Sequence, residues 1–210
     1  MDLNLWLTFV AASTALLIIP GPTVLLVLSY ALSQGRRVAV ASATGVALGD
    51  LIAMSASLAG LGALVLASAT AFTVLKWVGA AYLVWLGVKL IRSASKGGIA
   101  LPDAPEGIRA SAIFWHAAAV TALNPKSIAF FIAFVPQFIR ADAPLAPQFA
   151  VLIATFVALA ALNALAYALL ADRLRRTITR PYVVPWLTRA GGGALIGMGV
   201  LTATLRRAAG

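Results

Sequence analysis

Long stretches without charge are the feature that most constrains this sequence. Six segments are almost entirely apolar, at roughly residues 3–32, 38–67, 69–90, 112–139, 145–171 and 183–205. A helix needs about 20 apolar residues to cross a hydrocarbon core of about 30 Å. Barrel strands would be about ten residues long and would alternate apolar with polar side chains. Because lipid offers no partner for unpaired backbone groups, we predict that all six segments are helices.

The composition favours the same class of protein. Hydrophobic residues make up 62% of the 210 residues and charged residues 10%, against about 25% charged in a soluble domain. We therefore predict an all-α, polytopic membrane helix bundle with a single transmembrane domain over 1–210. The first segment is longer than the core of about 7–15 residues in a signal peptide and lacks a basic start, so we expect the mature protein to keep it.

The basic residues predict an orientation. The net charge of +10 does not indicate a nucleic-acid partner, because the basic residues are scattered over connections and helix ends. Eleven lie around the first, third and fifth connections and four on the opposite side. Since cytoplasmic loops are enriched in Lys and Arg, the odd connections are predicted to be cytoplasmic and both termini outside. The eleven are Arg36, Arg37, Lys89, Arg92, Lys96, Arg109, Arg173, Arg175, Arg176, Arg180 and Arg189, and the four are Lys76, Arg140, Arg206 and Arg207.

The chain also divides into two similar halves. A polar linker over 93–109 separates repeat halves 1–92 and 110–207, each with three predicted spans. An odd number of spans per half would make the halves inverted repeats, a common transporter plan with the substrate site between the repeats. The matched positions are Gly79 with Gly191, Gly87 with Gly199, Gly49-Asp50 with Leu162-Asn163, and Pro20-Gly21-Pro22 with Asn124-Pro125.

Asp50 is the only acidic residue inside a predicted span. A charge at mid-bilayer costs about 2.5–3.5 kcal/mol on insertion scales, so such a residue is usually paired or functional. We predict that Asp50 binds substrate or a coupling proton. The alternative is a structural polar group satisfied by neighbouring helices.

Lys126 is the only basic residue deep within a span. At 1.5 Å per residue, Asp50 and Lys126 both lie about 20 Å from the cytoplasmic ends of their helices. The two charges are therefore level, and together they match the ammonium and carboxylate of one small zwitterion. The alternative is a fixed ion pair that only sets helix register.

Two predicted helix breaks lie at similar depth, one in each half. Pro20, Gly21 and Pro22 remove two backbone donors and add a flexible point, so the first helix must kink or unwind and its freed carbonyls can face a cavity. Asn124 and Pro125 should interrupt the fourth helix in the same way. A packing kink is the alternative for either break. We predict that Pro20, Gly21, Pro22 and Pro125 line a cavity and that Asn124 and Asn163 join Asp50 and Lys126 in binding substrate or protons.

Other features have simpler interpretations. The pairs Gly45 with Gly49 and Gly193 with Gly197 predict close helix packing. His116, the only histidine, is interpreted as an interfacial or packing residue, with pH sensing as the alternative. The sequence has no cysteine and contains no recognisable metal-ligand cluster, phosphate loop or nucleophile set. We therefore expect no enzyme activity, no cofactor and no bound metal.

The ordered motifs resemble the LysE/RhtB family of bacterial amino-acid exporters over nearly the whole chain. They are Pro20-Gly21-Pro22, Gly35-Arg36-Arg37, Gly45, Gly49-Asp50, the run from Lys76 to Leu83, Asn124-Pro125-Lys126, Phe130-Phe131 and Pro136-Gln137-Phe138. One departure is His116 with Ala117, where similar proteins often have a glycine, which puts the close packing of that turn in doubt.

This resemblance implies a multi-pass protein of the bacterial inner (plasma) membrane, for which five-span and six-span models both exist. It implies outward movement of amino acids such as lysine, arginine, threonine, homoserine or leucine, driven by ion or proton exchange. It also places Asp50 and the two breaks where the transport site is expected.

The primary prediction is a secondary transporter that exports amino acids or related small zwitterionic metabolites by proton antiport. The expected partners are the small-molecule substrate, the lipid bilayer and a second copy in a homodimer. Two alternatives are a divalent metal-ion exporter, for which the spans offer a single carboxylate, and a non-transporting membrane scaffold.

Overall fold

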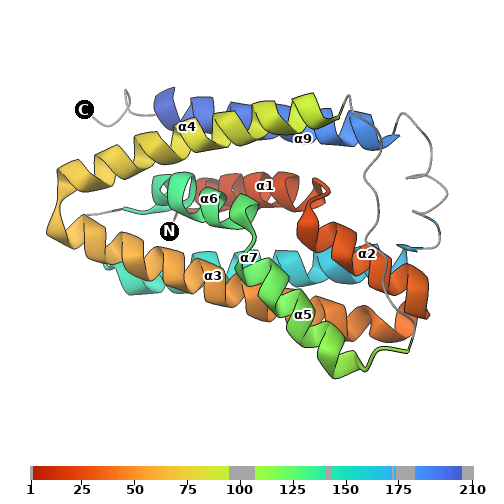
Figure 1. Ribbon diagram of the computed structural model, residues 1–210. Coiled ribbons are helices and arrows are strands. Elements are labelled where there is room, and N and C mark those ends of the chain that lie inside the picture. Colours follow the sequence, from red (N-terminus) through yellow and green to blue (C-terminus); the bar gives the residue numbers. More distant parts are fainter. Residues whose placement is uncertain (1, 95–106, 141–142, 172, 174–182, 205–210) are drawn as a thin grey trace.

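The structure, a computed structural model, describes residues 2–94, 107–140, 143–171, 173 and 183–204. Most of the predicted linker over 93–109 lies outside the described residues. The fold prediction is confirmed, because the chain forms an all-α membrane helix bundle (Figure 1). Its elements are α1 (Leu3–Ile18), α2 (Pro22–Gln34), η1 (Gly35–Val38), α3 (Ala39–Ala67), α4 (Ala69–Ser93), α5 (Ala110–Ala122), α6 (Pro125–Ala133), η2 (Val135–Phe138), α7 (Leu145–Leu169) and α9 (Val183–Thr204).

The helices match the predicted apolar segments. Within the described residues, α3, α4 and α7 are each long and apolar enough to cross a membrane. The pair α1 and α2 bends by 56°, the pair of α5 with α6–η2 bends by 45°, and each pair qualifies as one further span, which gives up to five. The helix α9 occupies the sixth predicted segment. Six full spans and the inverted repeat stay predictions.

The bent pairs and the long helices alternate in direction (Figure 1). The starts of α1, α4 and α7 and the end of α9 lie at the left of the view, and the ends of α2, α4 and α7 lie at the right. The first, third and fifth connections therefore join helix ends on one side of the bundle. This is the arrangement that the charge asymmetry requires, although which side faces the cytoplasm stays a prediction.

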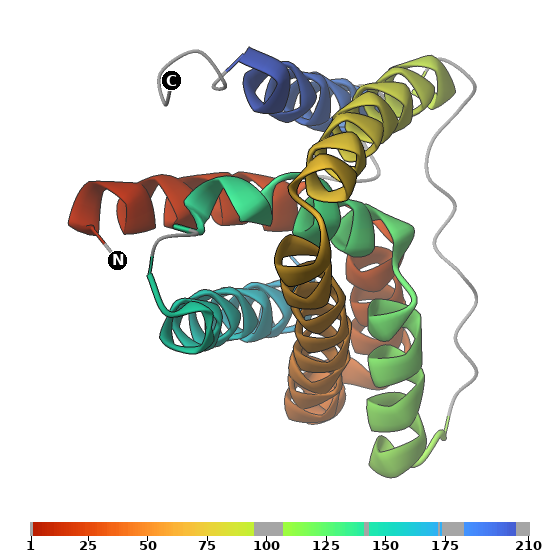
Figure 2. The ribbon, with the colours of Figure 1, turned by 90° about the vertical axis from the view of Figure 1, so that its left-hand side faces the viewer.

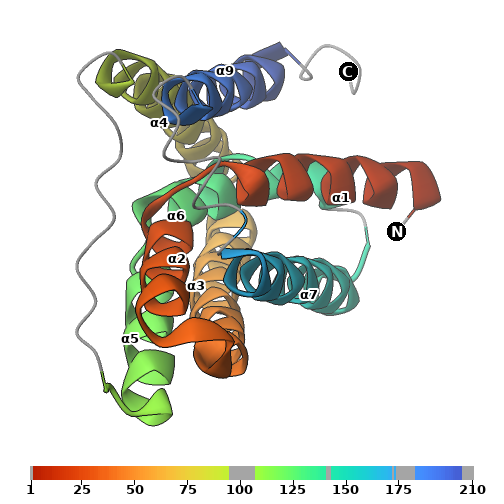
Figure 3. The same cartoon turned by 90° about the vertical axis from the view of Figure 1, so that its right-hand side faces the viewer.

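The helices pack in two groups around the broken pairs. In Figures 2 and 3, α4 and α9 pack together on one side of α1 and α6, and α2, α3, α5 and α7 lie on the other side. In the second group α3 packs against α7 as well as α5, and α7 also contacts α1 and α2.

The glycines matched between the halves all make close contacts. A Cβ atom on Gly87 would lie 2.5 Å from the backbone oxygen of Gly192 in α9, and one on Gly199 would lie 2.8 Å from that of Ala80 in α4. These two contacts correspond. A Cβ atom on Gly79 would meet Ala133 in α6, and one on Gly191 would meet Ile19 at the end of α1. These two contacts do not correspond, so the repeat stays a prediction.

The two predicted glycine pairs differ in their contacts with neighbouring helices. A Cβ atom on Gly45 or Gly49 would clash with the backbone of α5, so this pair permits close packing as predicted. The close contact includes Ala117, so the turn near His116 is tightly packed despite the departure from the family pattern. For Gly193 and Gly197 the prediction is wrong in the described part of the chain, because a Cβ atom there would meet nothing within 4 Å among those residues. Gly192 and Gly199 make the close contacts of α9 instead.

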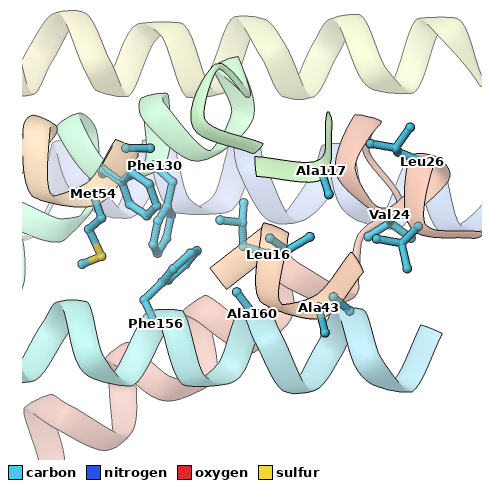
Figure 4. Close-up of a cluster of buried hydrophobic side chains, with 14 of the residues drawn as sticks. Leu16, Val24, Leu26, Ala43, Met54, Ala117, Phe130, Phe156 and Ala160 are labelled. Atoms are coloured by element: carbon cyan, nitrogen blue, oxygen red, sulfur yellow. The ribbon is translucent and has the colours of Figure 1, made fainter. Parts of the chain in front are cut away.

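Aromatic side chains fill the core beside the second break. Phe130 and Phe131 of α6 are fully buried and contact Phe156 of α7, with ring centroids 5.8 and 4.8 Å apart. Figure 4 shows Phe130 and Phe156 together with Met54 of α3. This packing fixes α6 against α3 and α7, and therefore fixes the start of α6, where Lys126 lies.

Large apolar side chains also cover the outside of the bundle. Leu162 is 63% exposed and Trp186 is 67% exposed. In water such surfaces would be unusual. In a bilayer they are the surfaces that contact lipid.

Candidate functional site

The break in the first half ends α1 at Ile18, and α2 begins at Pro22. The last carbonyls of a helix have no partner within that helix, so they must find one elsewhere. Here each of four consecutive carbonyls accepts a side-chain hydrogen bond from the second half of the chain. Lys126 Nζ donates to the oxygens of Leu16 (3.1 Å) and Ile19 (2.9 Å), Asn163 Nδ2 donates to Leu17 (3.1 Å), and the Tyr167 hydroxyl donates to Ile18 (2.8 Å).

The break in the second half separates α5 from α6 at Asn124. Asn124 is the N-cap of α6, and its side-chain oxygen accepts a hydrogen bond of 3.0 Å from the backbone N–H of Lys126. Its Nδ2 donates to Thr23 Oγ1 at 3.1 Å, and the Thr121 hydroxyl donates to the same oxygen at 3.3 Å. Both predicted breaks are therefore present, and polar side chains satisfy the backbone at each.

The two breaks are cross-linked in a reciprocal way. Lys126 follows the proline that starts α6, and it bonds to the break of the first half. Thr23 follows the proline that starts α2, and it bonds to the break of the second half. The polar contacts at each break therefore join the halves at mid-bundle.

One small cavity lies between the breaks. Asp50, Lys126, Asn124, Asn163 and Gly21 all line it, so the structure brings these five predicted residues together. The cavity leaves about 20 Å³ for the centre of a water molecule, which is room for about one water. The structure is thus closed around a polar centre that is too small for an amino acid.

The prolines lie beside the cavity rather than on its wall. Gly21 is a lining residue, whereas Pro20, Pro22 and Pro125 are not among the residues that line the cavity. Pro22 and Pro125 each occupy the first turn of a helix, where the missing N–H costs nothing. Their contribution is the break, and the breaks in turn present carbonyl and side-chain groups to the cavity.

Asp50 lies 2% exposed on α3 and faces this cavity. Its Oδ1 atom has no hydrogen-bond partner among the described residues. Within that part of the chain no ion pair joins Asp50 to Lys126, whose ammonium goes to the two α1 carbonyls instead. The structure therefore shows no direct Asp50–Lys126 ion pair among the described residues, and the roles of both residues stay predictions.

A family model for the LysE type translocator matches residues 14–206, which include both breaks, Asp50, Lys126 and Asn163. The chain belongs to the LysE type translocator family. An uncharacterized membrane protein of Vibrio cholerae is 34% identical over 206 residues, which cover 98% of this chain and all of that protein. Homoserine/homoserine lactone efflux proteins of Salmonella typhimurium and Salmonella typhi are 35% and 34% identical over 208 residues, 99% of this chain and the whole of each relative. No solved structure gives a significant match.

Sequence reasoning missed two polar residues of this LysE type translocator. Tyr167 lies four residues after Asn163 and therefore on the same face of α7, which is the signal that could have identified it. Thr23 occupies the same position after its break as Lys126, so the repeat alignment could have identified it. Neither residue is charged, and in a span a hydroxyl attracts less notice than a carboxylate or an ammonium.

His116 of the translocator lies away from the cavity. Its Nδ1 and the Tyr30 hydroxyl form a hydrogen bond of 2.6 Å that joins α5 to α2. This contact gives His116 a packing partner on a neighbouring helix. A role in pH sensing stays a prediction.

Proposed function

We propose that this translocator exports amino acids or related small zwitterionic metabolites across the bacterial inner membrane by proton antiport. The observation that carries the proposal is the buried carboxylate of Asp50, whose Oδ1 atom has no hydrogen-bond partner in the described part of the chain and which lines the same cavity as Lys126. The efflux names of the Salmonella relatives support outward transport of an amino acid or a compound derived from one.

The charges of the cavity favour a zwitterion. One carboxylate and one ammonium give the cavity no net charge, so an amino acid with both groups can enter without leaving an uncompensated charge in the membrane. An anion or a cation alone would leave one, which is costly at that depth. The amide groups of Asn124 and Asn163 supply neutral donors and acceptors for the rest of the substrate.

Transport requires the cavity to enlarge alternately toward each side. The two halves meet at the breaks, and broken helices at mid-membrane are where inverted-repeat transporters bind their substrates. In this proposal the halves rock about the contacts between them, and the closed structure is the state between the two openings.

Asp50 couples the movement to protons. A carboxyl group can take up a proton from outside and release it inside as the halves rock, so that inward proton movement drives outward substrate movement.

The test is efflux of radiolabelled homoserine and other amino acids from proteoliposomes, with and without a pH gradient. Asp50→Asn is expected to abolish the stimulation by the gradient, because an amide cannot carry the proton. Asp2→Asn is the matched control, since Asp2 is exposed at the start of α1 and should leave coupled efflux unchanged. Unaltered coupled efflux in Asp50→Asn would remove Asp50 from the mechanism.

Export of a divalent metal ion would require a different set of side chains in the spans. Divalent cations need several oxygen, nitrogen or sulfur ligands, and no group of three or more His, Cys, Asp or Glu side chains that could hold a metal ion occurs among the residues that the structure describes. Growth inhibition by a panel of amino acids and metals, with and without expression, separates the two. Protection against amino acids is the expected result, and protection against metals alone would contradict the proposal.

A further inference from the structure

The four carbonyls at the end of α1 are held by two kinds of donor. We call the oxygens of Leu16, Leu17, Ile18 and Ile19 the break carbonyls. The oxygens of Leu17 and Ile18 accept from an amide and a phenol, both neutral groups on α7. Those of Leu16 and Ile19 accept from a primary ammonium, the same chemical group that an amino acid carries.

We propose that the oxygens of Leu16 and Ile19, with Asp50 across the cavity, form the binding site for the ammonium group of the substrate. In the empty protein the ammonium of Lys126 occupies this site and acts as a latch, which the substrate ammonium displaces. The inference rests on the proposed function, and it specifies which atoms recognise one end of the substrate.

The position suits a cation. Carbonyls at the C-terminal end of a helix carry a partial negative charge, which favours ammonium groups. A primary ammonium has three N–H donors, so it can bond to both carbonyls and still have one donor for a carboxylate. A quaternary ammonium has none and cannot replace it.

Gly21 leaves the room that this ammonium occupies. A Cβ atom on Gly21 would lie 3.2 Å from Lys126 Nζ and 3.4 Å from its Cε, which is closer than an ordinary contact. The chain therefore lacks a side chain where the ammonium sits.

Asp50 supplies the third partner of the substrate ammonium. Its Oδ1 atom is buried, has no hydrogen bond among the described residues and faces the cavity that Lys126 also lines. When the substrate ammonium takes the two carbonyls, the displaced Lys126 ammonium can pair with the substrate carboxylate. A zwitterion adds no net charge, so the exchange keeps the cavity neutral.

The exchange also links binding to opening. Lys126 belongs to α6 in the second half, and the carbonyls of Leu16 and Ile19 belong to the first half. Release of Lys126 removes two hydrogen bonds between the halves at the point where the cavity must widen. Substrate binding thereby loosens the closed state.

The test replaces the tethered ammonium by a free one. Lys126→Ala empties the site, and propylammonium should then bind and raise the Tm of the purified variant by roughly 2–4 °C at about five times its dissociation constant. Tetramethylammonium should have no such effect on the variant. Propylammonium should raise the Tm of the wild type much less than that of the variant, because there it must displace Lys126 and brings no carboxylate for the lysine. Equal shifts in variant and wild type, or equal shifts by the two amines, would overturn the proposal.

The substrate must compete for the same site. In Lys126→Ala, saturating propylammonium together with a saturating exported amino acid should shift Tm no further than the stronger ligand alone. Additive shifts would show that the substrate ammonium binds elsewhere and would overturn the assignment.

A second variant serves if Lys126→Ala does not fold. The chain has no cysteine, so Lys126→Cys gives a single reactive thiol. A reagent that attaches an aminoethyl group through a disulfide should restore the Tm, because it returns a primary ammonium. A reagent that attaches a trimethylammonioethyl group should not restore the Tm. If both reagents restored the Tm, the proposed displacement of the Lys126 ammonium would be contradicted.

The two proposals can fail separately. A wild type that exports no amino acid refutes the proposed function, while the propylammonium experiment still tests the ammonium site. A wild type that exports amino acids while Lys126→Ala ignores propylammonium refutes only the ammonium site.

Discussion

Tyr167 shows how a single hydroxyl contributes to the closed site. Its O–H donates to the oxygen of Ile18 at 2.8 Å, and this carbonyl has no partner within α1. Tyr167→Phe keeps the ring and removes the donor. We expect a loss of about 1 kcal/mol, which lowers Tm by roughly 2–4 °C in detergent.

The matched control is Tyr82→Phe on α4. The Tyr82 hydroxyl makes no hydrogen bond to the described residues, so this change should leave Tm unaltered. Equal Tm values for both variants would mean that the Ile18 carbonyl gains nothing from Tyr167.

At this scale the sequence predicted which residues meet but not how they bond. Asp50 and Lys126 stand out because a charge inside a span is costly, and their equal depth predicted that they would lie level. Depth says nothing about the direction of a side chain around its helix. Lys126 bonds to carbonyls that exist as acceptors only because α1 stops at Ile18, so its partners follow from the geometry of the break.

The contact between α3 and α5 is set by glycines on one helix face. A Cβ atom on Gly49 would lie 2.5 Å from the oxygen of Ala118 and 2.6 Å from Thr121 Cβ. Gly49→Ala should therefore force the helices apart, at a cost of about 1–3 kcal/mol. We expect a Tm several degrees lower in a thermal unfolding measurement of the purified protein.

Gly60→Ala on the same helix is the control, since a Cβ atom there meets nothing within 4 Å. It should leave Tm unchanged or slightly higher, because alanine favours helices. A Gly49→Ala variant as stable as Gly60→Ala would show that α3 and α5 do not need this close approach.

The same spacing rule succeeded in α3 and failed in α9, for a physical reason. Small residues four apart share a helix face, but the spacing does not say which face meets a neighbour. Gly193 and Gly197 share a face with open space, and Gly192 and Gly199 turn toward α4. Repeat matching selected Gly191 and Gly199 in α9, and both make close contacts, although the repeat itself stays a prediction.

For the whole molecule, hydrophobic length and breaker residues were sufficient to predict the helices. The predicted segment 38–67 corresponds to α3 (Ala39–Ala67), and 145–171 corresponds to α7 (Leu145–Leu169). The prolines predicted that each helix would kink or unwind, and the bends of 56° and 45° give the size of the break. Their size and the closure of the cavity depend on packing between the halves, which periodicity within one segment does not contain.

Orientation is the property of the whole molecule that the charges predict. The ends of α2, α4 and α7 lie on one side of the bundle (Figure 1), and the connections there carry most of the basic residues. Because the chain has no cysteine, single introduced cysteines can show which side of the membrane each helix end faces.

In right-side-out membrane vesicles, a membrane-impermeant maleimide should label Asp2→Cys and Ala146→Cys, which lie at the opposite side of the bundle. Ser111→Cys, at the start of α5, should react only after the vesicles are permeabilised. The reverse pattern would invert the orientation, and labelling of Asp2→Cys and Ser111→Cys from the same side would contradict the alternating path of the helices.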